Sequence, residues 1–258
     1  PPRSTLFPYT TLFRSTDTFP KAVLKTGGIN GGRYTVAGVA KGAGMIMPNM
    51  ATMLSFVLTD AALDPALINN LFHRSVDRSF NAITIDGDTS TNDTCLLMAN
   101  GAAGTAVITA GSPEAEEFAR LLDEVLLDLA KLIVRDGEGV TKFVEIRITG
   151  ADTDADAKRA AMAVANSSLV KTAFFGQDAN WGRIFAAVGY SGAKVDPDRL
   201  ALWFDDVCMA RDGVFAGGDA EARGTEVLRN KELVVTVDIG VGARSEEHTS
   251  ELQSPNTI

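Results

Sequence analysis

Alternating hydrophobic and polar positions predict β-strands along much of the chain. The segments KAVLK and RYTVAGV, joined by the glycine-rich TGGINGG, predict a β-hairpin with these glycines in its turn. The same period of two predicts strands at 52–59, 141–150 and 232–240. Shorter apolar runs, NAITID, LALWFDD and VCMARDGVF, are also typical of strands. The last third of the chain is therefore expected to be rich in β-structure.

Helical spacing of apolar residues is clearest between residues 112 and 139. Ser112 and Pro113 are typical of a helix start, acidic residues occupy the first turns, and Gly137 and Gly139 follow the last turn. Further helices are predicted at 64–80, at 152–166 and within NWGRIFAAVGYSG. Strands and helices alternate without an internal repeat, so the class is α/β or α+β.

Composition and charge narrow the function classes. The chain has 258 residues and a net charge of −9, and an acidic protein without a basic stripe argues against nucleic acid or anionic membrane as a partner. No apolar run approaches the roughly 18 residues of a membrane span. Cys95 and Cys208 lie far apart without metal-ligand spacing, so we expect reduced thiols, no metal site and a cytoplasmic location.

Two terminal segments resemble translated sequencing adapters, namely TLFPYTTLFRS (5–15) and RSEEHTSELQS (244–254). We therefore expect residues 1–15 and 244–258 to be non-native and set them aside for fold reasoning. Because these segments contain equal numbers of acidic and basic residues, the net charge of the remainder is unchanged. Their removal leaves His73 as the single histidine, and we expect it to be a structural or surface residue of the helix that Asp64 and Pro65 begin.

Three motifs that suggest ligand sites have simpler explanations. GAGMIMPN lacks the Gly-Lys-Ser/Thr of a phosphate-binding loop. DGDTSTND begins like a calcium loop, but Gly87 comes too early and Leu97 occupies the position of the bidentate Glu, so we interpret it as a turn with side-chain hydrogen bonds. Asn180, Trp181 and Arg183 fit a helix cap with packing as well as they fit a polar anchor.

Thr52 has two interpretations. It follows a glycine- and methionine-rich loop and begins a predicted strand, which is an ordinary position for threonine. Alternatively, cleavage after Ala51 would give Thr52 a free α-amine, and that amine could act as the base that activates its own hydroxyl. Its unperturbed pKa of about 7.7–8.0 suits proton transfer near neutral pH. The residues alone leave both interpretations open.

The segment KGAGMIMPNMATML resembles the cleavage motif of the ornithine acetyltransferase family, the bifunctional glutamate N-acetyltransferases of arginine biosynthesis. TDTFPK, SFNAITIDGDTSTNDT, RDGEGVTK, SLVKTAFFGQDANWGRIFAAVGYSG and VDIGVG resemble the family in the same order. The resemblance implies a layered αββα-type sandwich with a smaller C-terminal α+β domain. It divides the chain into the end of an α chain (16–51), the first part of a β chain (52–165) and a C-terminal domain (166–243).

The resemblance also implies a mechanism and a set of site residues. Self-cleavage between Ala51 and Thr52 would create the nucleophile, which carries an acetyl group from N2-acetylornithine to glutamate without a cofactor. Lys41, Thr52 and Glu138 match positions that bind substrate in the family. A further substrate-binding hydroxyl falls on Ser15, inside the adapter-like segment, with Thr16 beside it. Whether acetyl-CoA also serves as a donor is left open.

Relative to the family, the chain lacks most of the α chain, including a Thr-Gly pair that forms the oxyanion hole, and a C-terminal tail with a substrate-binding Asn and Thr. We therefore expect an active full-length enzyme, assembled as an α2β2 heterotetramer, and a nearly inactive 258-residue chain. Two alternatives stay open at this point. One is a self-cleaving aminopeptidase of related fold, and the other is a non-catalytic α/β binding module.

Overall fold

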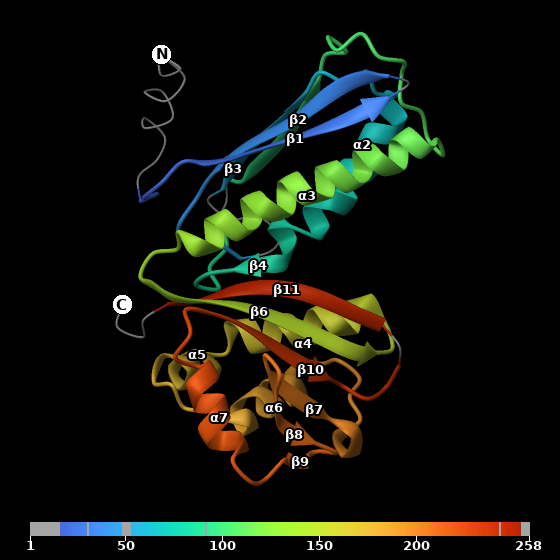
Figure 1. Cartoon of the computed structure of the whole chain (residues 1–258). Coiled ribbons are helices and arrows are strands. Elements are labelled where there is room, and N and C mark those ends of the chain that lie inside the picture. The colour runs from blue at the N-terminus through green and yellow to red at the C-terminus, as the bar shows by residue number, and fades with distance from the viewer. Residues whose placement is uncertain (1–15, 30, 48–52, 91, 243, 254–258) are drawn as a thin grey trace. The chain divides into compact units, whose positions relative to one another are not determined.

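The computed structural model describes residues 16–29, 31–47, 53–90, 92–242 and 244–253. It divides into two compact units, one of residues up to Ile83 together with Asp88–Asp136, and one of Thr84–Gly87 together with the residues from Gly137 onward. Both units combine helices with a sheet (Figure 1), which confirms the predicted α/β (α+β) class. The predicted boundary between residues 165 and 166 stays a prediction.

The first unit contains a four-stranded sheet in the order β1-β2-β3-β5. β1 and β2 form an antiparallel hairpin, β3 pairs antiparallel with β2, and β5 pairs parallel with β3. The helix α3 packs against β1 and β2, and α2 packs against α3 (Figure 1). The bounds are Lys21–Ile29 (β1), Gly32–Lys41 (β2), Leu54–Thr59 (β3), Thr94–Ala99 (β5), Pro65–Asp77 (α2) and Pro113–Arg135 (α3).

The hairpin turn is shorter than the sequence predicts. Thr26, Gly27 and Gly28 were expected in the turn, but they belong to β1. Gly27 pairs with Tyr34 across the hairpin, and a Cβ on Gly27 would lie 2.3 Å from the Tyr34 ring. The glycine is required because the buried aromatic ring covers its backbone, and not because the chain turns there.

Both predicted helix starts in this unit are confirmed. The side chain of Asp64 accepts a hydrogen bond from the Ala66 N–H at 2.9 Å, and Pro65 is the first residue of α2. Ser112 caps α3 in the same way, with a 3.1 Å bond from the Ala115 N–H. These caps satisfy backbone donors that have no partner within the helix.

The second unit contains a seven-stranded sheet in the order β4-β11-β6-β10-β7-β8-β9. Its core combines apolar residues of the sheet with those of α4, α5 and α6. The strands are Ile83–Thr84 (β4), Val140–Ala151 (β6), Ala201–Phe204 (β7), Val207–Arg211 (β8), Val214–Phe215 (β9), Glu232–Asp238 (β10) and Arg244–Gln253 (β11). The helices are Asp154–Asn166 (α4), Ser168–Phe175 (α5), Trp181–Tyr190 (α6) and Ala220–Val227 (α7), with a short 3-10 turn at Pro197–Arg199 (η2). The other 3-10 turn, Phe80–Ala82 (η1), belongs to the first unit.

β11 coincides with most of the C-terminal adapter-like segment and pairs antiparallel with β6. A strand pairing depends mainly on backbone groups, which every residue carries. The non-native origin of residues 244–258 therefore stays a prediction from their sequence.

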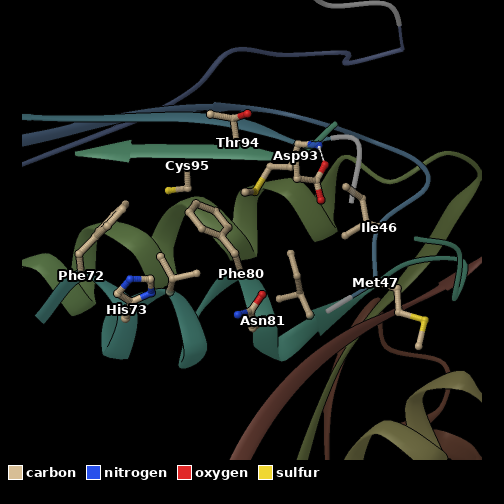
Figure 2. A pocket seen from close by; sticks show the side chains of 12 residues that line it. Ile46, Met47, Phe72, His73, Phe80, Asn81, Asp93, Thr94 and Cys95 are labelled. Atoms are coloured by element: carbon tan, nitrogen blue, oxygen red, sulfur yellow. Dashed lines mark hydrogen bonds between the residues drawn. The ribbon is translucent and has the colours of Figure 1, made fainter. Parts of the chain in front are cut away.

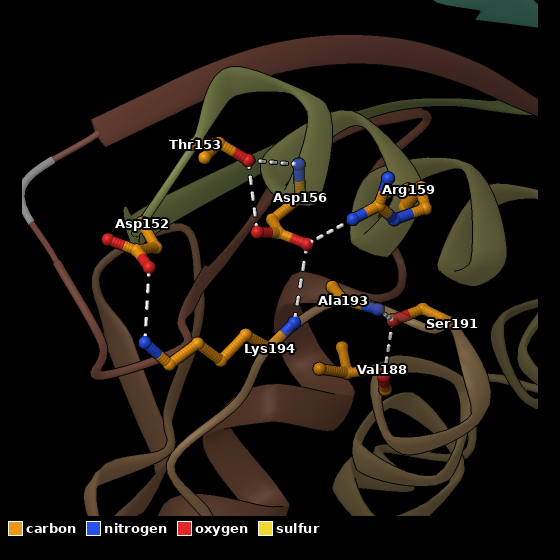
Figure 3. Close-up of polar contacts among 8 residues, drawn as sticks. All are labelled: Asp152, Thr153, Asp156, Arg159, Val188, Ser191, Ala193 and Lys194. Carbon is orange, nitrogen blue, oxygen red and sulfur yellow. Dashed lines mark hydrogen bonds and ion pairs between the residues drawn. The ribbon is translucent and has the colours of Figure 1, made fainter.

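The start of α4 is fixed by a reciprocal cap (Figure 3). The Thr153 hydroxyl accepts a hydrogen bond from the Asp156 N–H at 3.1 Å and donates one to the Asp156 carboxylate at 3.0 Å. Asp156 also binds Arg159 and accepts from the Lys194 N–H at 3.3 Å. The hydrogen bond from Thr153, the bond from the Lys194 N–H and the charge of Arg159 together lower the pKa of Asp156 despite its partial desolvation.

Candidate active site

The proposed cleavage residues Ala51 and Thr52 lie outside the described residues. The structure describes the chain on both sides of them, up to Met47 and again from Met53. β3 begins at Leu54, which pairs with Lys41, the last residue of β2. The sheet register therefore places the backbone of the predicted substrate-binding Lys41 directly opposite the residue that lies two positions after Thr52.

Met53 is held by Asp93 and Thr94 on the neighbouring chain segment. Its N–H donates to Asp93 Oδ1 at 2.6 Å, and its carbonyl accepts from the Thr94 N–H at 3.1 Å. The first bond is made by a side chain, and the second is a backbone bond at the start of the parallel pairing of β3 with β5. Sequence reasoning missed Asp93, although an acidic residue directly before a predicted strand gives a weak signal.

The carboxylate of Asp93 is partly withdrawn from water. Burial raises its pKa, whereas the hydrogen bond from the Met53 N–H and the positive charge of Lys41 oppose this rise. Asp93 thus interacts both with the backbone of Met53 and with the ammonium of Lys41. The cation of Lys41 lies at the end of β2, and the carboxylate of Asp93 is bound to Met53, directly before β3.

A cavity of about 410 Å³ lies beside Met53 and between β5 and α2 (Figure 2). Most of its lining is apolar, and His73, Asn81 and Asp93 supply polar groups. Burial raises the pKa of the Cys95 thiol to about 11, against the opposing effect of a hydrogen bond with Ser55. The lining residues are Ile46, Met47, Met53, Phe72, His73, Val76, Phe80, Asn81, Ile83, Asp93, Thr94 and Cys95.

His73 lies on α2 with an exposed side chain. This confirms its predicted place on a helix surface, although that surface also borders the cavity. The structure shows no hydrogen bond between His73 and another described lining residue that would mark it as a general base.

A buried ion cluster lies at the end of the same sheet that carries Lys41. Lys21 Nζ is 2.5 Å from Asp17 Oδ1 and 2.5 Å from Asp136 Oδ2, and all three side chains are almost completely buried. Asp17 Oδ1 also accepts a hydrogen bond from the Gly42 N–H at 3.0 Å. Although burial raises the pKa of Asp17, the bonds from Lys21 and Gly42 and the charge of Lys21 outweigh it, so the pKa is lowered.

Thr16 and Glu138, two further predicted site residues, are exposed. Thr16 lies next to the ion cluster in the first unit, and Glu138 lies in the second unit just after α3. Ser15 lies outside the described residues. The substrate-binding roles of Thr16, Lys41 and Glu138 stay predictions.

Two of the three motifs that suggest ligand sites, the GDTSTND loop and the group around Asn180, form local structural contacts. In the GDTSTND loop, the Ser90 hydroxyl accepts from the Asn92 N–H at 3.3 Å, as expected of a side-chain turn. Asn180 caps α6 through the Arg183 N–H at 3.3 Å, and the Arg183 guanidinium donates to the Leu169 carbonyl at 2.8 Å. The Trp181 ring packs edge-on against Phe185.

Among the described residues, no helix combines the length and the apolar character that crossing a bilayer requires.

Comparisons with known proteins identify the family of this chain. The model of the ArgJ family matches residues 10–254. The chain is 70% identical over 239 residues to the arginine biosynthesis bifunctional protein ArgJ of Geobacter sulfurreducens, covering 92% of this chain and 61% of that protein. It is 55% identical to the protein of the same name from Syntrophotalea carbinolica, with the same coverages. The chain thus spans about three fifths of the length of these curated relatives.

A solved structure shares the fold. The crystal structure of the arginine biosynthesis bifunctional protein ArgJ from Bacillus halodurans is 35% identical in sequence and superposes with a TM-score of 0.75, covering 78% of this chain and 94% of that chain. The family model covers most of the sequence, and the Geobacter relative is highly similar over nearly all of it. The chain belongs to the ArgJ family.

Proposed function

We propose that the full-length protein transfers an acetyl group from N2-acetylornithine to glutamate, through an acetyl ester on Thr52, in arginine biosynthesis. Membership of the ArgJ family and the motif KGAGMIMPNMATML support this assignment. The observation that carries it is the register between β2 and β3. That register pairs Lys41, a cation suited to a substrate carboxylate, with Leu54, two residues after the proposed nucleophile.

The nucleophile arises by cleavage of its own peptide bond. Thr52 Oγ attacks the carbonyl carbon of Ala51, and the bond from that carbon to the Thr52 nitrogen breaks, which leaves an ester. Water then hydrolyses the ester, releasing a carboxylate on Ala51 and a free α-amine on Thr52. No histidine is needed, because the new amine supplies a base with an ordinary pKa of about 7.7–8.0.

Acetyl transfer then proceeds in two halves. Thr52 Oγ attacks the acetyl carbonyl of N2-acetylornithine while the α-amine accepts the hydroxyl proton. The tetrahedral oxyanion collapses, its carbon–nitrogen bond breaks, and the proton passes to the departing amine of ornithine. The neutral α-amine of glutamate attacks the acetyl ester, and the proton that it loses returns through the Thr52 amine to Thr52 Oγ.

The site must accept two different amino acids in turn, so we expect it to pair with their α-carboxylates and with their side-chain charges. Lys41 is assigned to the α-carboxylate, and Glu138 to the cationic side chain of ornithine. Thr16 is assigned a substrate contact as the neighbour of Ser15, on which the family position falls. The partners are small-molecule substrates and the α and β chains of one precursor in an α2β2 assembly, and both described cysteines are free thiols, as suits the cytoplasm.

The test uses a full-length protein, extended to the length of the curated relatives. It compares Thr52→Ala with a control, Thr26→Ala, which changes an exposed residue of β1. We expect the control to yield two chains by intact mass and to transfer acetyl groups, and Thr52→Ala to yield one unprocessed, inactive chain. An unprocessed but active Thr52→Ala protein would refute the proposal. Release of amino acids from peptides, without acetyl transfer, would favour the aminopeptidase alternative.

A further inference from the structure

The ion cluster of Asp17, Lys21 and Asp136 joins three segments that are distant in the sequence. Asp17 precedes β1, Lys21 is the first residue of β1, and Asp136 is the C-cap of α3. The exposed fractions of their side chains are 2%, 0% and 1%. Burying three charged side chains this completely carries a large desolvation penalty, so their presence needs an explanation other than stability alone.

The cluster is completed by hydrogen bonds from backbone and hydroxyl groups. The Thr18 N–H donates to both carboxylate oxygens of Asp136, at 3.1 and 3.0 Å, and the Thr18 hydroxyl donates to Oδ1. The Lys21 ammonium also lies 5.3 Å from the centre of the Phe19 ring. One ammonium faces two carboxylates, and these additional donors stabilise the remaining negative charge.

Three proposed substrate-binding residues, Thr16, Lys41 and Glu138, lie within two positions of a cluster member or of a residue that the cluster binds. Thr16 directly precedes Asp17, and Glu138 follows Asp136 by two residues. Lys41 directly precedes Gly42, whose N–H is bound by Asp17. Gly42 has a φ of 147°, in a region that L-residues with side chains avoid, so this loop backbone has a specific conformation for Asp17 to hold.

We propose that Lys21, together with Asp17 and Asp136, is a positioning residue that fixes the backbone beside the substrate-binding residues and above all at Lys41. This inference rests on the proposed function. The link from Lys21 to Lys41 passes through Asp17 and the Gly42 N–H. Without the ammonium, the two buried carboxylates repel each other, Asp17 moves or takes up a proton, and the Gly42 backbone loses its acceptor.

A second lysine on the same strand provides a matched control. Lys25 faces the same helix, with its Nζ 3.2 Å from Asp128 Oδ2 and 3.6 Å from Glu124 Oε2. Its side chain is 35% exposed, and among the described residues neither partner carboxylate bonds to the Gly42 N–H, which donates to Asp17. Lys25→Met therefore removes an ion pair between β1 and α3 without affecting the hydrogen bonds at Gly42.

The experiment compares Lys21→Met, Lys21→Arg, Asp17→Asn, Lys25→Met and Lys41→Met in the full-length protein. Processing is followed by intact mass, folding by circular dichroism and thermal unfolding, and transfer by the KM and kcat for N2-acetylornithine and glutamate. Asp17→Asn is the milder variant, because the amide keeps an oxygen acceptor for Gly42 while losing the charge. It keeps the test decisive if Lys21→Met fails to fold.

For folded and processed Lys21→Met, we expect kcat/KM to fall by about 10- to 100-fold, mainly through a higher KM. A displacement of a binding group by about 1 Å can lower the rate by about 100-fold. Asp17→Asn should change in the same direction by a smaller factor, Lys21→Arg should retain more activity than Lys21→Met, and Lys25→Met should match the parent protein. Unchanged KM values in a folded Lys21→Met or Asp17→Asn protein would overturn the inference. If Lys41→Met itself keeps full activity, the proposed substrate site fails instead.

Discussion

The backbone N–H of Met53 donates a hydrogen bond to Asp93 Oδ1 at 2.6 Å. Because Met53 directly follows the proposed nucleophile in the sequence, this bond fixes the chain one residue from Thr52. The Thr94 N–H adds a second anchor on the Met53 carbonyl, at 3.1 Å. The beginning of β3 is thus held from β5, by residues some forty positions away in the chain.

Removing the Asp93 carboxylate should loosen this anchor. For Asp93→Ala we expect a loss of about 1–3 kcal/mol in the free energy of unfolding, typical of a hydrogen bond to a charged acceptor and its unpaired donor. Urea denaturation of this chain measures the loss. Asp206→Ala, at an exposed turn between β7 and β8, is the control and should change stability by less than about 0.5 kcal/mol. Equal stability of the two variants would contradict the anchoring role.

Acid should weaken the ion cluster through Asp17. Its pKa is lower in the folded protein than in the unfolded chain, so the unfolded chain binds more protons between the two values. The contribution of Asp17 is therefore fully present above the unfolded pKa of about 3.9 and is lost as the pH falls through the folded value.

Free energies of unfolding for the parent chain and Asp17→Asn, measured from pH 7 down to pH 2, check this dependence. We expect the parent to be more stable at pH 7 and the difference to shrink below about pH 4. A difference that stays constant down to pH 2 would mean that the charge of Asp17 does not contribute to stability.

The Cys95 thiol should react slowly in the folded protein. Burial raises its pKa to about 11, and the thiolate is the reactive form. In a Cys208→Ser background, we expect alkylation by iodoacetamide at pH 8 to be at least about tenfold slower than in the urea-unfolded chain. Mass spectrometry of timed samples gives both rates. Similar rates in the folded and unfolded chains would contradict the burial of this thiol.

A methyl group on Gly27 should disrupt the packing of β1. It would lie 2.3 Å from Tyr34 Cζ and 2.7 Å from Leu121 Cδ1. We expect Gly27→Ala to cost about 1–3 kcal/mol in the free energy of unfolding, as overpacking usually does. Urea denaturation measures the loss.

Gly28→Ala is the matched control for this prediction. It lies on the same strand, and the nearest atom to its added Cβ is the Gly32 carbonyl oxygen at 3.7 Å, an ordinary contact distance. The control should therefore retain almost all of the parent stability. If both variants are equally stable, Tyr34 does not constrain position 27.

The sequence by itself determined most strands and four of the described helices, α2, α3, α4 and α6, whereas α5 and α7 were not predicted. The caps at Asp64 and Ser112 and the apolar spacing of α3 are local signals, because a helix satisfies its hydrogen bonds between residues close in the chain. The ordered motifs likewise indicate the family of the chain without reference to its fold. These features depend on residue type and spacing alone.

The tertiary structure decided the features that depend on pairing between distant segments. The sequence predicts Gly27 in a turn, but it lies in β1, where the Tyr34 ring covers it across the hairpin. Lys21 and Asp136 are 115 residues apart, and Asp93 is 40 residues from Met53. A residue pattern does not encode which buried charge meets which, because that follows from strand register and from the packing of α3 on the sheet.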